Sequence, residues 1–417
     1  MAEFFNVLEP EKALNLLLEY TNHRTQVERL STSQALGRIT ASPNFAPHDL
    51  PAFRRSSMDG YAVRAADTFG ASNTLPAILN VVGEVTMGSV PEIALAATEA
   101  ATIHTGGMLP EDADAVVQIE NTQVVDSIDQ TQMPFEIEVF RPVAVGQNAI
   151  QVGEDVQRSS EVLPAGQCLR SQDIGGMLAL GITEIQVSKK PEVAIIATGD
   201  EIVQPADTLK KGQIRDINSY TIAALVEQHG GTPVLWGIVN DNFESLMKAA
   251  SIALSAHDML VITAGSSVSV RDLTVQVIGQ LGEPGVLLHG VATRPGKPTV
   301  LGAAQGKPVL GLPGNPVSAM VQFLLLGVPA LYRLGGLDNM PLRGTIRAKI
   351  SRNVPSASGR EDYVPVKVEE SSEGLVAEPV FGKSNLIYTL VKANGLMKIP
   401  MNQSGFRAGD WVDVLLI

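Results

Sequence analysis

Short apolar runs alternate with amphipathic stretches through residues 191–336. The apolar runs have the length and composition of buried parallel strands and lie at 193–197, 234–239, 259–263, 286–291 and 309–312. Apolar residues between them recur at a spacing near 3.6, which predicts helices at 220–229, 243–256, 272–281 and 316–333. This rhythm predicts βαβ units, and therefore a central doubly wound α/β domain with parallel strands.

The chain outside this region has a different pattern. Residues 8–21 predict an amphipathic helix, and three prolines within residues 43–51 predict a boundary. Short β-rich runs follow up to residue 143, and glycines then punctuate residues 145–190, which predicts a mostly antiparallel β domain and an elongated connector. Alternating runs after residue 341 predict a small β-barrel or sandwich. We therefore expect four domains, at residues 1–50 with 145–190, 51–144, 191–336 and 337–417.

Composition narrows the class of protein. Of 417 residues, 45% are hydrophobic and 18% are charged, as in folded globular proteins, and the net charge of −13 argues against nonspecific binding of nucleic acid. The single cysteine, Cys168, excludes intrachain disulfides and fits a reducing compartment. The N-terminus has no signal-peptide pattern, and no apolar stretch is expected to span a bilayer. We therefore expect a cytoplasmic protein that binds neither membranes nor nucleic acid.

Glycine-rich loops follow most strands of the α/β region. They contain Thr198-Gly199-Asp200-Glu201, Asp241, Ala264-Gly265-Ser266-Ser267 and Pro313-Gly314-Asn315-Pro316. Ligands of doubly wound sheets bind at the carboxyl ends of the strands, so these loops are expected to line one crevice. Glycine permits close backbone approach, and N–H groups at a helix N-terminus attract anions. The loops predict an oxyanion site, although any one of them alone fits a plain strand-to-helix turn, with Asn315 as the N-cap before Pro316.

Charges of both signs occur in the same region. The acidic residues are Asp200, Glu201, Asp216, Asp241 and Asp272. The segment from Arg294 through Gly296 to Lys297 is basic. Carboxylates repel a phosphate unless a divalent cation lies between them, so the mixture predicts Mg²⁺ with a phosphate or pyrophosphate, and Arg294 and Lys297 neutralising the remaining charge. For each acid taken singly, an N-cap or first-turn position of a helix is the alternative, and it suits Asp241 and Asp272 best.

Seven motifs occur in an order seen in one known family: SSMDGYAV, HTGGMLP, GEDV, TGDE, AGSSVSVRD, RPGKP and LPGNPVSA. With a GRED segment in the C-terminal β region, they resemble the MoeA family of molybdopterin molybdenumtransferases, which includes the E domain of gephyrin. The resemblance covers nearly the whole chain. It implies insertion of molybdate into adenylylated molybdopterin, with Mg²⁺-assisted release of AMP. It also implies an elongated homodimer, and we expect contact with the molybdopterin adenylyltransferase.

The resemblance also assigns roles to residues. The implied catalytic residues are Asp59, Thr105, Glu201, Asp241 and Asp272, and Glu201, Asp241 and Asp272 are the expected metal ligands. The implied substrate-binding residues are Asp155, Thr198, Gly199, Asp200, Gly265, Ser267, Arg294, Gly296, Lys297, Pro313, Gly314, Asn315, Pro316, Arg360 and Ser384. Asp59 and Thr105 are implied to reach the crevice of the opposite subunit, whereas the Asp59-Gly60 pair by itself would indicate a plain hairpin turn.

Three departures from the family pattern are visible. Ala264-Gly265 stands where the family usually has two glycines, Arg294 stands where a lysine is frequent, and His104 replaces an apolar residue. These departures keep a non-catalytic molybdopterin-binding or scaffolding relative as an alternative. A tungstate-inserting homologue is another, because the two oxyanions are nearly identical in size and charge. A nucleotidyltransferase that makes the adenylylated pterin is disfavoured, because the regions flanking the α/β domain match the metal-inserting enzyme.

Overall fold

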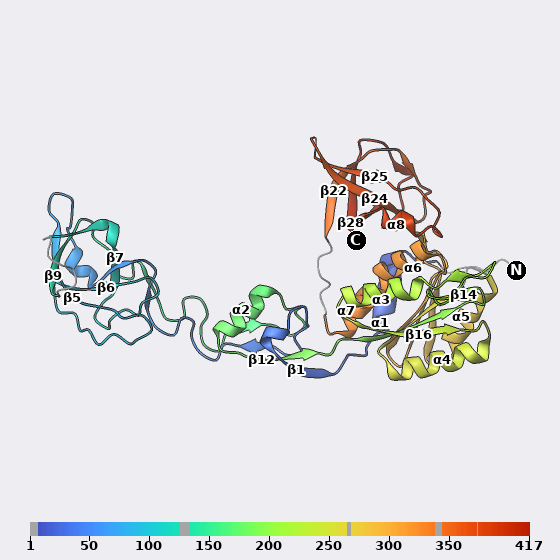
Figure 1. Ribbon diagram of the computed structural model, residues 1–417, viewed down its shortest axis with the longest axis horizontal. Helices are drawn as coiled ribbons and strands as arrows, with labels where there is room; N and C mark the ends of the chain where they lie inside the picture. The colour runs from blue at the N-terminus through green and yellow to red at the C-terminus, as the bar shows by residue number, and fades with distance from the viewer. Residues whose placement is uncertain (1–6, 126–132, 265–267, 338–343, 373) are drawn as a thin grey trace. The chain divides into compact units, whose positions relative to one another are not determined.

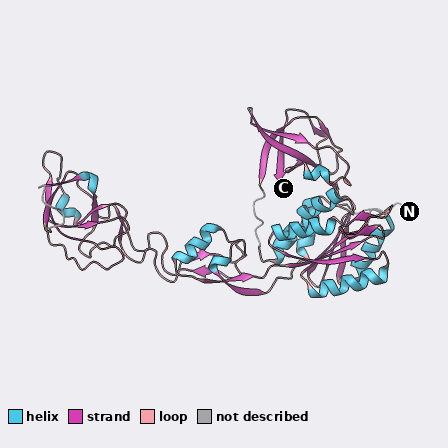
Figure 2. Ribbon diagram, viewed as in Figure 1, coloured by secondary structure: helices cyan, strands magenta, loops and turns pink. Residues whose placement is uncertain are grey.

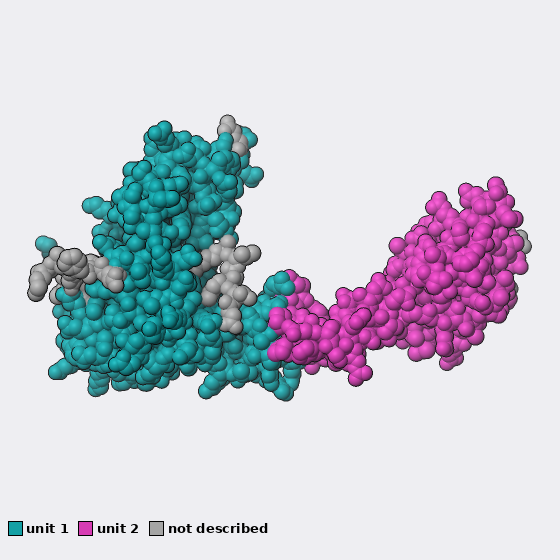
Figure 3. All heavy atoms as spheres, turned by 180° about the vertical axis from the view of Figure 1, so that it is seen from behind, with its two compact units in different colours: residues 1–42, 165–170, 184–417 teal, residues 43–164, 171–183 magenta. Residues whose placement is uncertain are grey.

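The structure, a computed structural model, describes residues 7–125, 133–264, 268–337, 344–372 and 374–417. They form two compact units, of which the first holds residues 1–42, 165–170 and 184–417 and the second holds residues 43–164 and 171–183 (Figure 3). The four domain ranges expected from the sequence stay predictions.

A six-stranded sheet forms the centre of the first unit. Its order is β16-β13-β17-β21-β20-β18, with bounds Thr232–Val239, Glu192–Thr198, Met259–Ala264, Lys307–Leu312, Val300–Ala304 and Pro284–His289. The strands β16, β13, β17 and β21 are mutually parallel, as the apolar runs predicted. The sheet is nevertheless not parallel throughout, because a strand that the sequence did not predict, β20, pairs antiparallel with both β21 and β18. A tight turn at Gln305 and Gly306, both with positive φ, joins β20 to β21, as in a hairpin.

Helices cover both faces of this sheet (Figures 1 and 2). Val193 and Ile195 of β13 point into one core, and Ala194 and Ile196 point into the other, all with no exposed surface. The first core includes residues of the helices α1 (Pro10–Glu19), α3 (Asn218–Gln228), α6 (Pro316–Gln322) and α7 (Val328–Leu334). The second includes residues of α4 (Phe243–Ala256) and α5 (Val268–Gln280). The continuous apolar runs are thus explained by burial on both sides.

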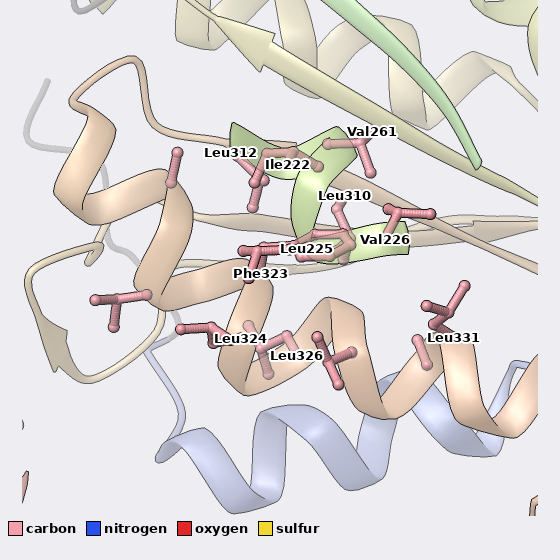
Figure 4. Close-up of a cluster of buried hydrophobic side chains, with 14 of the residues drawn as sticks. Ile222, Leu225, Val226, Val261, Leu310, Leu312, Phe323, Leu324, Leu326 and Leu331 are labelled. Atoms are coloured by element: carbon pink, nitrogen blue, oxygen red, sulfur yellow. The ribbon is translucent and has the colours of Figure 1, made fainter. Parts of the chain in front are cut away.

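The helical stretch from Pro316 to Leu334 is long and apolar enough to span a membrane, contrary to the expectation that no stretch is. However, 78% of its most apolar window is buried, and its side chains pack against α3 and the sheet (Figure 4). A π-helical turn, Phe323–Gly327, lies between α6 and α7. A Cβ on Gly327 would lie 2.4 Å from the Phe323 ring, so glycine makes room for this fully buried side chain. This stretch is a core helix of the α/β domain.

The C-terminal part of the first unit is a closed five-stranded β-barrel. Its strands are β22 (Thr345–Ile350), β24 (Glu361–Ser371), β25 (Gly374–Pro379), β26 (Gly395–Ile399) and β28 (Trp411–Leu416), and the pairing of β24 with β26 closes the sheet. A short strand of the α/β domain, β19 (Thr293–Arg294), pairs with the start of β24. The RPGKP loop is therefore bound directly to the barrel. The multidomain α/β plus β fold class expected from the sequence is confirmed.

The second unit contains a mostly antiparallel sheet, as expected. Its order is β7-β4-β6-β5-β9-β8, with bounds Ala115–Gln118, Gly60–Val63, Glu99–Ile103, Ala77–Glu84, Phe135–Val139 and Thr122–Val124. A Cβ on Gly60 would lie 1.9 Å from the Val117 carbonyl oxygen, so only glycine allows β4 to lie this close to β7. The unit also includes α2 (Ser171–Ala179) and the short strand pairs β2 (Asn44–Phe45) with β11 (Glu161–Leu163) and β3 (Arg55–Ser56) with β10 (Ala149–Ile150). Strands β1 (Val27–Ser31) and β12 (Glu184–Ser188) pair within the first unit.

Candidate active site

Acidic residues gather where β13 and β16 end. The Thr198 hydroxyl donates to Asp241 Oδ1 at 2.5 Å, and the Asp241 N–H lies 3.5 Å from Asp200 Oδ1. A Cβ on Gly199 would approach the Ile202 side chain to 2.8 Å, so glycine permits this turn. The two loops therefore form one acidic corner, with the Thr198 side chain fully buried beneath it.

Helix capping does not account for Asp241 or Asp272. Asn242 caps α4 through a 2.9 Å bond from the Ser245 N–H, and Asp241 precedes that cap. Asp272 is the fifth residue of α5, whose first turn holds no acid. The capping alternative is therefore wrong for both residues. It holds for Asp216, which is buried and accepts a 3.1 Å bond from the Ser219 N–H at the start of α3.

The three expected metal ligands, Glu201, Asp241 and Asp272, do not gather into one cluster in the described part of the chain. Glu201 and Asp272 are half-buried, and Glu201 adjoins Asp200 in the acidic corner. Within the described part of the chain, no three His, Cys, Asp or Glu side chains converge as in a complete protein-made metal site. Mg²⁺ commonly takes only one or two carboxylates, its other ligands being water and substrate phosphates. The acidic corner suits a site of this kind. Two further residues expected to bind substrate, Gly265 and Ser267, lie outside the described residues.

A cationic cavity of about 640 Å³ lies between the α/β domain and the barrel. Four basic side chains line it, Arg294 and Lys297 from the RPGKP loop and Arg360 and Lys383 from the barrel side, against one lining carboxylate, Asp362. Pro313, Asn315 and Ser384 also line it. The volume is that of a small-molecule site, and the charge favours an anion. The structure thus brings Arg294, Lys297 and Arg360 together with the LPGNP loop, whereas the loops at Thr198 and Asp241 do not line this cavity.

Asp362 joins two of the cations. It is 2% exposed, and its Oδ1 accepts a 2.8 Å bond from Arg360 Nε. Its Oδ2 lies 3.7 Å from Arg294 Nη1. The backbones of Arg294 and Asp362 are also register partners in the β19–β24 pair. One buried carboxylate therefore pairs with a guanidinium from each domain.

Gln322 supports the RPGKP loop from beneath. Its Nε2 donates to Thr293 Oγ1 at 2.9 Å and to the Pro295 carbonyl at 3.0 Å, and the side chain is fully buried. Gly296 has φ +108°, and a Cβ there would lie 2.4 Å from the Gln322 side chain. The loop conformation therefore depends on glycine at this position and on the amide below it.

The LPGNP loop is fastened to the barrel. Pro316 begins α6, and Asn315 occupies the N-cap position as expected, but its side chain makes no capping bond. Asn315 Nδ2 instead donates to Ser384 Oγ at 3.0 Å, and the Ser384 carbonyl accepts the Val317 N–H at 3.1 Å. The expectation that this side chain caps the helix is therefore wrong, because a barrel residue supplies the acceptor. The Gly314 carbonyl accepts a 2.9 Å bond from Asn218 Nδ2.

The second unit holds Asp59 and Thr105 in direct contact. The Thr105 N–H and hydroxyl both donate to Asp59 Oδ1, at 2.7 and 3.0 Å. These bonds, the backbone one above all, hold the pKa of Asp59 below its ordinary value. His104 Nε2 lies 3.1 Å from Glu84 Oε1, and its Nδ1 lies 3.8 Å from Asp59. Asp155 is exposed and lines a separate cavity of about 650 Å³ in this unit.

Three of these residues, Asp362, Gln322 and Lys383, were not predicted from the sequence. Asp362 follows the GRED arginine by two positions, but nothing in a short β-rich run marks it as buried. Gln322 is a polar residue inside an apolar helical run, a signal that could have drawn attention to it. Lys383 stands in a loop with no recognisable motif.

Comparison with known proteins gives the family. Residues 8–181 match the MoeA N-terminal region (domain I and II), residues 194–333 match a probable molybdopterin binding domain, and residues 347–417 match the MoeA C-terminal region (domain IV). A putative molybdopterin biosynthesis protein of Methanocaldococcus jannaschii is 37% identical, over 96% of this chain and 95% of its own. The molybdopterin molybdenumtransferase of Bacillus subtilis is 33% identical, over 94% and 90%.

Comparison with solved structures gives the same family. Two MoeA protein structures from Pyrococcus horikoshii are 37% and 31% identical, with TM-scores of 0.80 and 0.85, and the alignments cover 99% of this chain and 99% and 100% of theirs. The matches cover the two ends of the chain as well as the α/β domain between them. The protein therefore belongs to the MoeA family and is a transferase of molybdenum cofactor biosynthesis.

Proposed function

We propose that this protein inserts molybdate into adenylylated molybdopterin and releases AMP with the help of Mg²⁺. The observation that carries the proposal is the cationic cavity between the RPGKP loop and the barrel, which lies at the same edge of the sheet as the loops after its parallel strands. The family and the names of the relatives give the reaction class. The cavity residues give the chemistry of an anion site.

In this proposal, the cavity receives the oxyanion. Arg294 and Arg360 offer forked N–H donors, Lys297 adds a point charge, and the Ser384 hydroxyl adds a neutral hydrogen-bonding group. The fixed donors replace water around the anion, so little reorganisation is needed when charge moves during the transfer. These side chains bind and orient the oxyanion. Gln322 holds the RPGKP loop through the Pro295 carbonyl, and Asn315 joins the LPGNP loop to Ser384.

The acidic residues would bind the metal ion and not the oxyanion. Asp241, Asp272 and Glu201 would hold Mg²⁺ together with phosphate oxygens of the substrate, in the manner usual for this ion. Bound Mg²⁺ would supply neutralisation of the charge that develops on the phosphoanhydride. Thr198 orients Asp241 through its 2.5 Å hydrogen bond, so the carboxylate is fixed before the substrate arrives. Asp200 lies beside Asp241, and Thr198 and Gly199 shape the turn that brings them together.

The proposal includes a homodimer in the cytoplasm. Asp59 and Thr105 of one subunit would close the crevice of the other, and contact with the molybdopterin adenylyltransferase would deliver the adenylylated substrate. The family pattern motivates these assignments, and the Thr105 N–H and hydroxyl hold the Asp59 carboxylate in place. Asp155 in the same unit is proposed to contact substrate.

The test is release of AMP from adenylylated molybdopterin by the purified protein. AMP should appear only when molybdate and Mg²⁺ are both present, and EDTA should stop it reversibly. Tight binding of the pterin without molybdate-dependent AMP release would favour a scaffolding relative. Faster release with tungstate at equal concentration would favour a tungstate-inserting enzyme, and consumption of ATP with formation of the adenylylated pterin would favour a nucleotidyltransferase.

A further inference from the structure

The wall of the cationic cavity contains a buried carboxylate, Asp362. Asp362 is 2% exposed and is the single acid among four lining cations. By charge alone it opposes an anionic ligand, because its field subtracts from that of the arginines. Its geometry indicates another role, since its two oxygens face two different guanidiniums.

We propose that Asp362 is a positioning residue, which fixes Arg294 and Arg360 so that their remaining donors face one oxyanion. The inference rests on the proposed function, because it takes the cavity as the molybdate site. It extends that function by adding a residue that acts through the two arginines and does not itself touch the ligand.

The donor atoms make this arrangement workable. Arg360 uses Nε for its 2.8 Å bond to Asp362 Oδ1, which leaves both Nη groups for a ligand. Arg294 approaches Asp362 Oδ2 with Nη1, at 3.7 Å, which leaves Nε and Nη2. A guanidinium carries five N–H donors in a planar fork, so one edge can be anchored while another binds. The two arginines can therefore hold Asp362 and an oxyanion together.

The Arg294 side chain has most to gain from an anchor. It is 64% exposed, and a free arginine samples many rotamers. If the side chain becomes fixed only when the ligand binds, the lost conformational entropy lowers the affinity for the ligand. Asp362 and the β19–β24 pairing restrict Arg294 before any ligand arrives. The anchor also connects the two domains, since Arg294 comes from the α/β domain and Asp362 from the barrel.

Asp362→Asn separates positioning from charge, because the two effects have opposite signs. The variant keeps the size of the side chain and makes the cavity more positive by one charge. If Asp362 acted only through its charge, molybdate would bind more tightly in the variant. If it positions the arginines, molybdate should bind about tenfold more weakly, the size of effect of losing a hydrogen bond to a charged group.

The experiment is calorimetric titration of molybdate into the full-length protein at fixed ionic strength, without pterin. Asp413→Asn is the matched control, because Asp413 pairs with Arg347 at 3.7 Å on the exposed side of the same barrel. Weaker binding in Asp362→Asn, with Asp413→Asn like the wild type, supports the inference. Equal or tighter binding in Asp362→Asn overturns it.

Further measurements distinguish positioning by Asp362 from general destabilisation and from failure of the proposed function. In turnover, Asp362→Asn should raise the KM for molybdate about tenfold and leave the KM for the adenylylated pterin near the wild-type value, a split that general destabilisation would not produce. If Asp362→Asn fails to fold, Asp362→Glu displaces the carboxylate by one methylene and should also weaken molybdate binding; unchanged binding there contradicts the inference. Failure of the wild-type protein to bind molybdate, or binding that Arg360→Ala leaves unchanged, would instead overturn the proposed function.

Discussion

Asn315 Nδ2 donates a 3.0 Å hydrogen bond to Ser384 Oγ and thereby joins the loop after β21 to the C-terminal barrel. The Ser384 carbonyl also accepts the Val317 N–H, so a residue of the barrel completes the N-terminus of an α/β-domain helix. Both residues line the cationic cavity. Domain attachment and the proposed anion binding therefore share the same contact.

Ser384→Ala tests this dual role. The variant loses the side-chain bond but keeps the backbone bond to Val317, so the free energy of unfolding should fall by only about 1 kcal/mol. The KM for molybdate should rise while kcat changes little, because a ground-state contact to the oxyanion is removed. Denaturant unfolding and AMP-release kinetics measure the two effects. Ser351→Ala, at an exposed position of the barrel, is the control; a stability loss in Ser384→Ala without any change in KM would contradict the binding role.

Asp241 and Asp216 form a second matched pair. Asp241 precedes the cap of α4 and accepts from Thr198, whereas Asp216 caps α3. Asp241→Asn should lower kcat by at least about 100-fold, as expected for a lost charge at a metal site, and should change stability little. Asp216→Ala should show the reverse, with a modest change in turnover and about 1 kcal/mol of lost stability, because alanine cannot accept the Ser219 N–H. Equal losses of turnover and stability in Asp241→Asn would return Asp241 to a structural role.

Much of the α/β domain could be predicted from sequence because its signals are local. Runs such as 193–197 are apolar on both faces, and the helices between them have regular periodicity. The antiparallel strand β20 escaped prediction because Val300–Ala304 is short and has two small residues at its end, and the Gln305-Gly306 turn after it lacks the usual asparagine or aspartate. The pattern of apolar residues does not indicate whether a strand runs parallel or antiparallel to its neighbours.

The candidate site was predictable where a loop carries its own chemistry. The RPGKP and LPGNP motifs identified Arg294, Lys297 and Asn315, and all three line the cavity. What each side chain does depends on a residue distant in sequence. Ser384 lies 69 positions from Asn315 and replaces the expected cap with an interdomain bond. Such pairings arise from tertiary packing, which sequence patterns do not record.

Gly296 and Gln322 give a test of loop support. Gly296→Ala places a Cβ 2.4 Å from the Gln322 side chain at a φ of +108°, and should therefore displace the RPGKP loop. We expect weaker molybdate binding and a loss of roughly 1 to 3 kcal/mol in stability. In Gly296→Ala/Gln322→Ala the steric conflict is removed, while the backbone strain and the loss of the two Gln322 hydrogen bonds remain. The double variant should be more stable than the sum of the single changes predicts; strict additivity, by denaturant unfolding, would show that the two residues are not coupled.

Thr105→Val tests the Asp59 pair through its pH dependence. The Thr105 N–H and hydroxyl stabilise the ionised Asp59, so the Asp59 pKa in the folded protein lies below the ordinary value of 3.8. Valine removes the hydroxyl donor and keeps the N–H donor, so the pKa should rise toward 3.8 without reaching it. Carboxyl NMR titration of the full-length protein measures the change, and Thr122→Val, which removes an exposed hydroxyl elsewhere in the same unit, should leave it unaltered.

The sign of the stability effect follows from the depressed pKa. A carboxylate whose pKa is lower in the folded state contributes stability above pH 3.8, and this contribution is lost as the pH falls through the lower folded value. The difference in melting temperature between the wild type and Thr105→Val should therefore be constant near neutral pH and shrink at acidic pH. Because a carboxyl whose pKa lies below 3.8 loses its proton below pH 5, a pH profile of AMP release from pH 5 to 8 should have the same shape in both proteins. A profile that shifts with Thr105→Val would mean that Asp59 gains its proton within the working range, and so that its environment in the catalytic complex differs from the one described for the second unit.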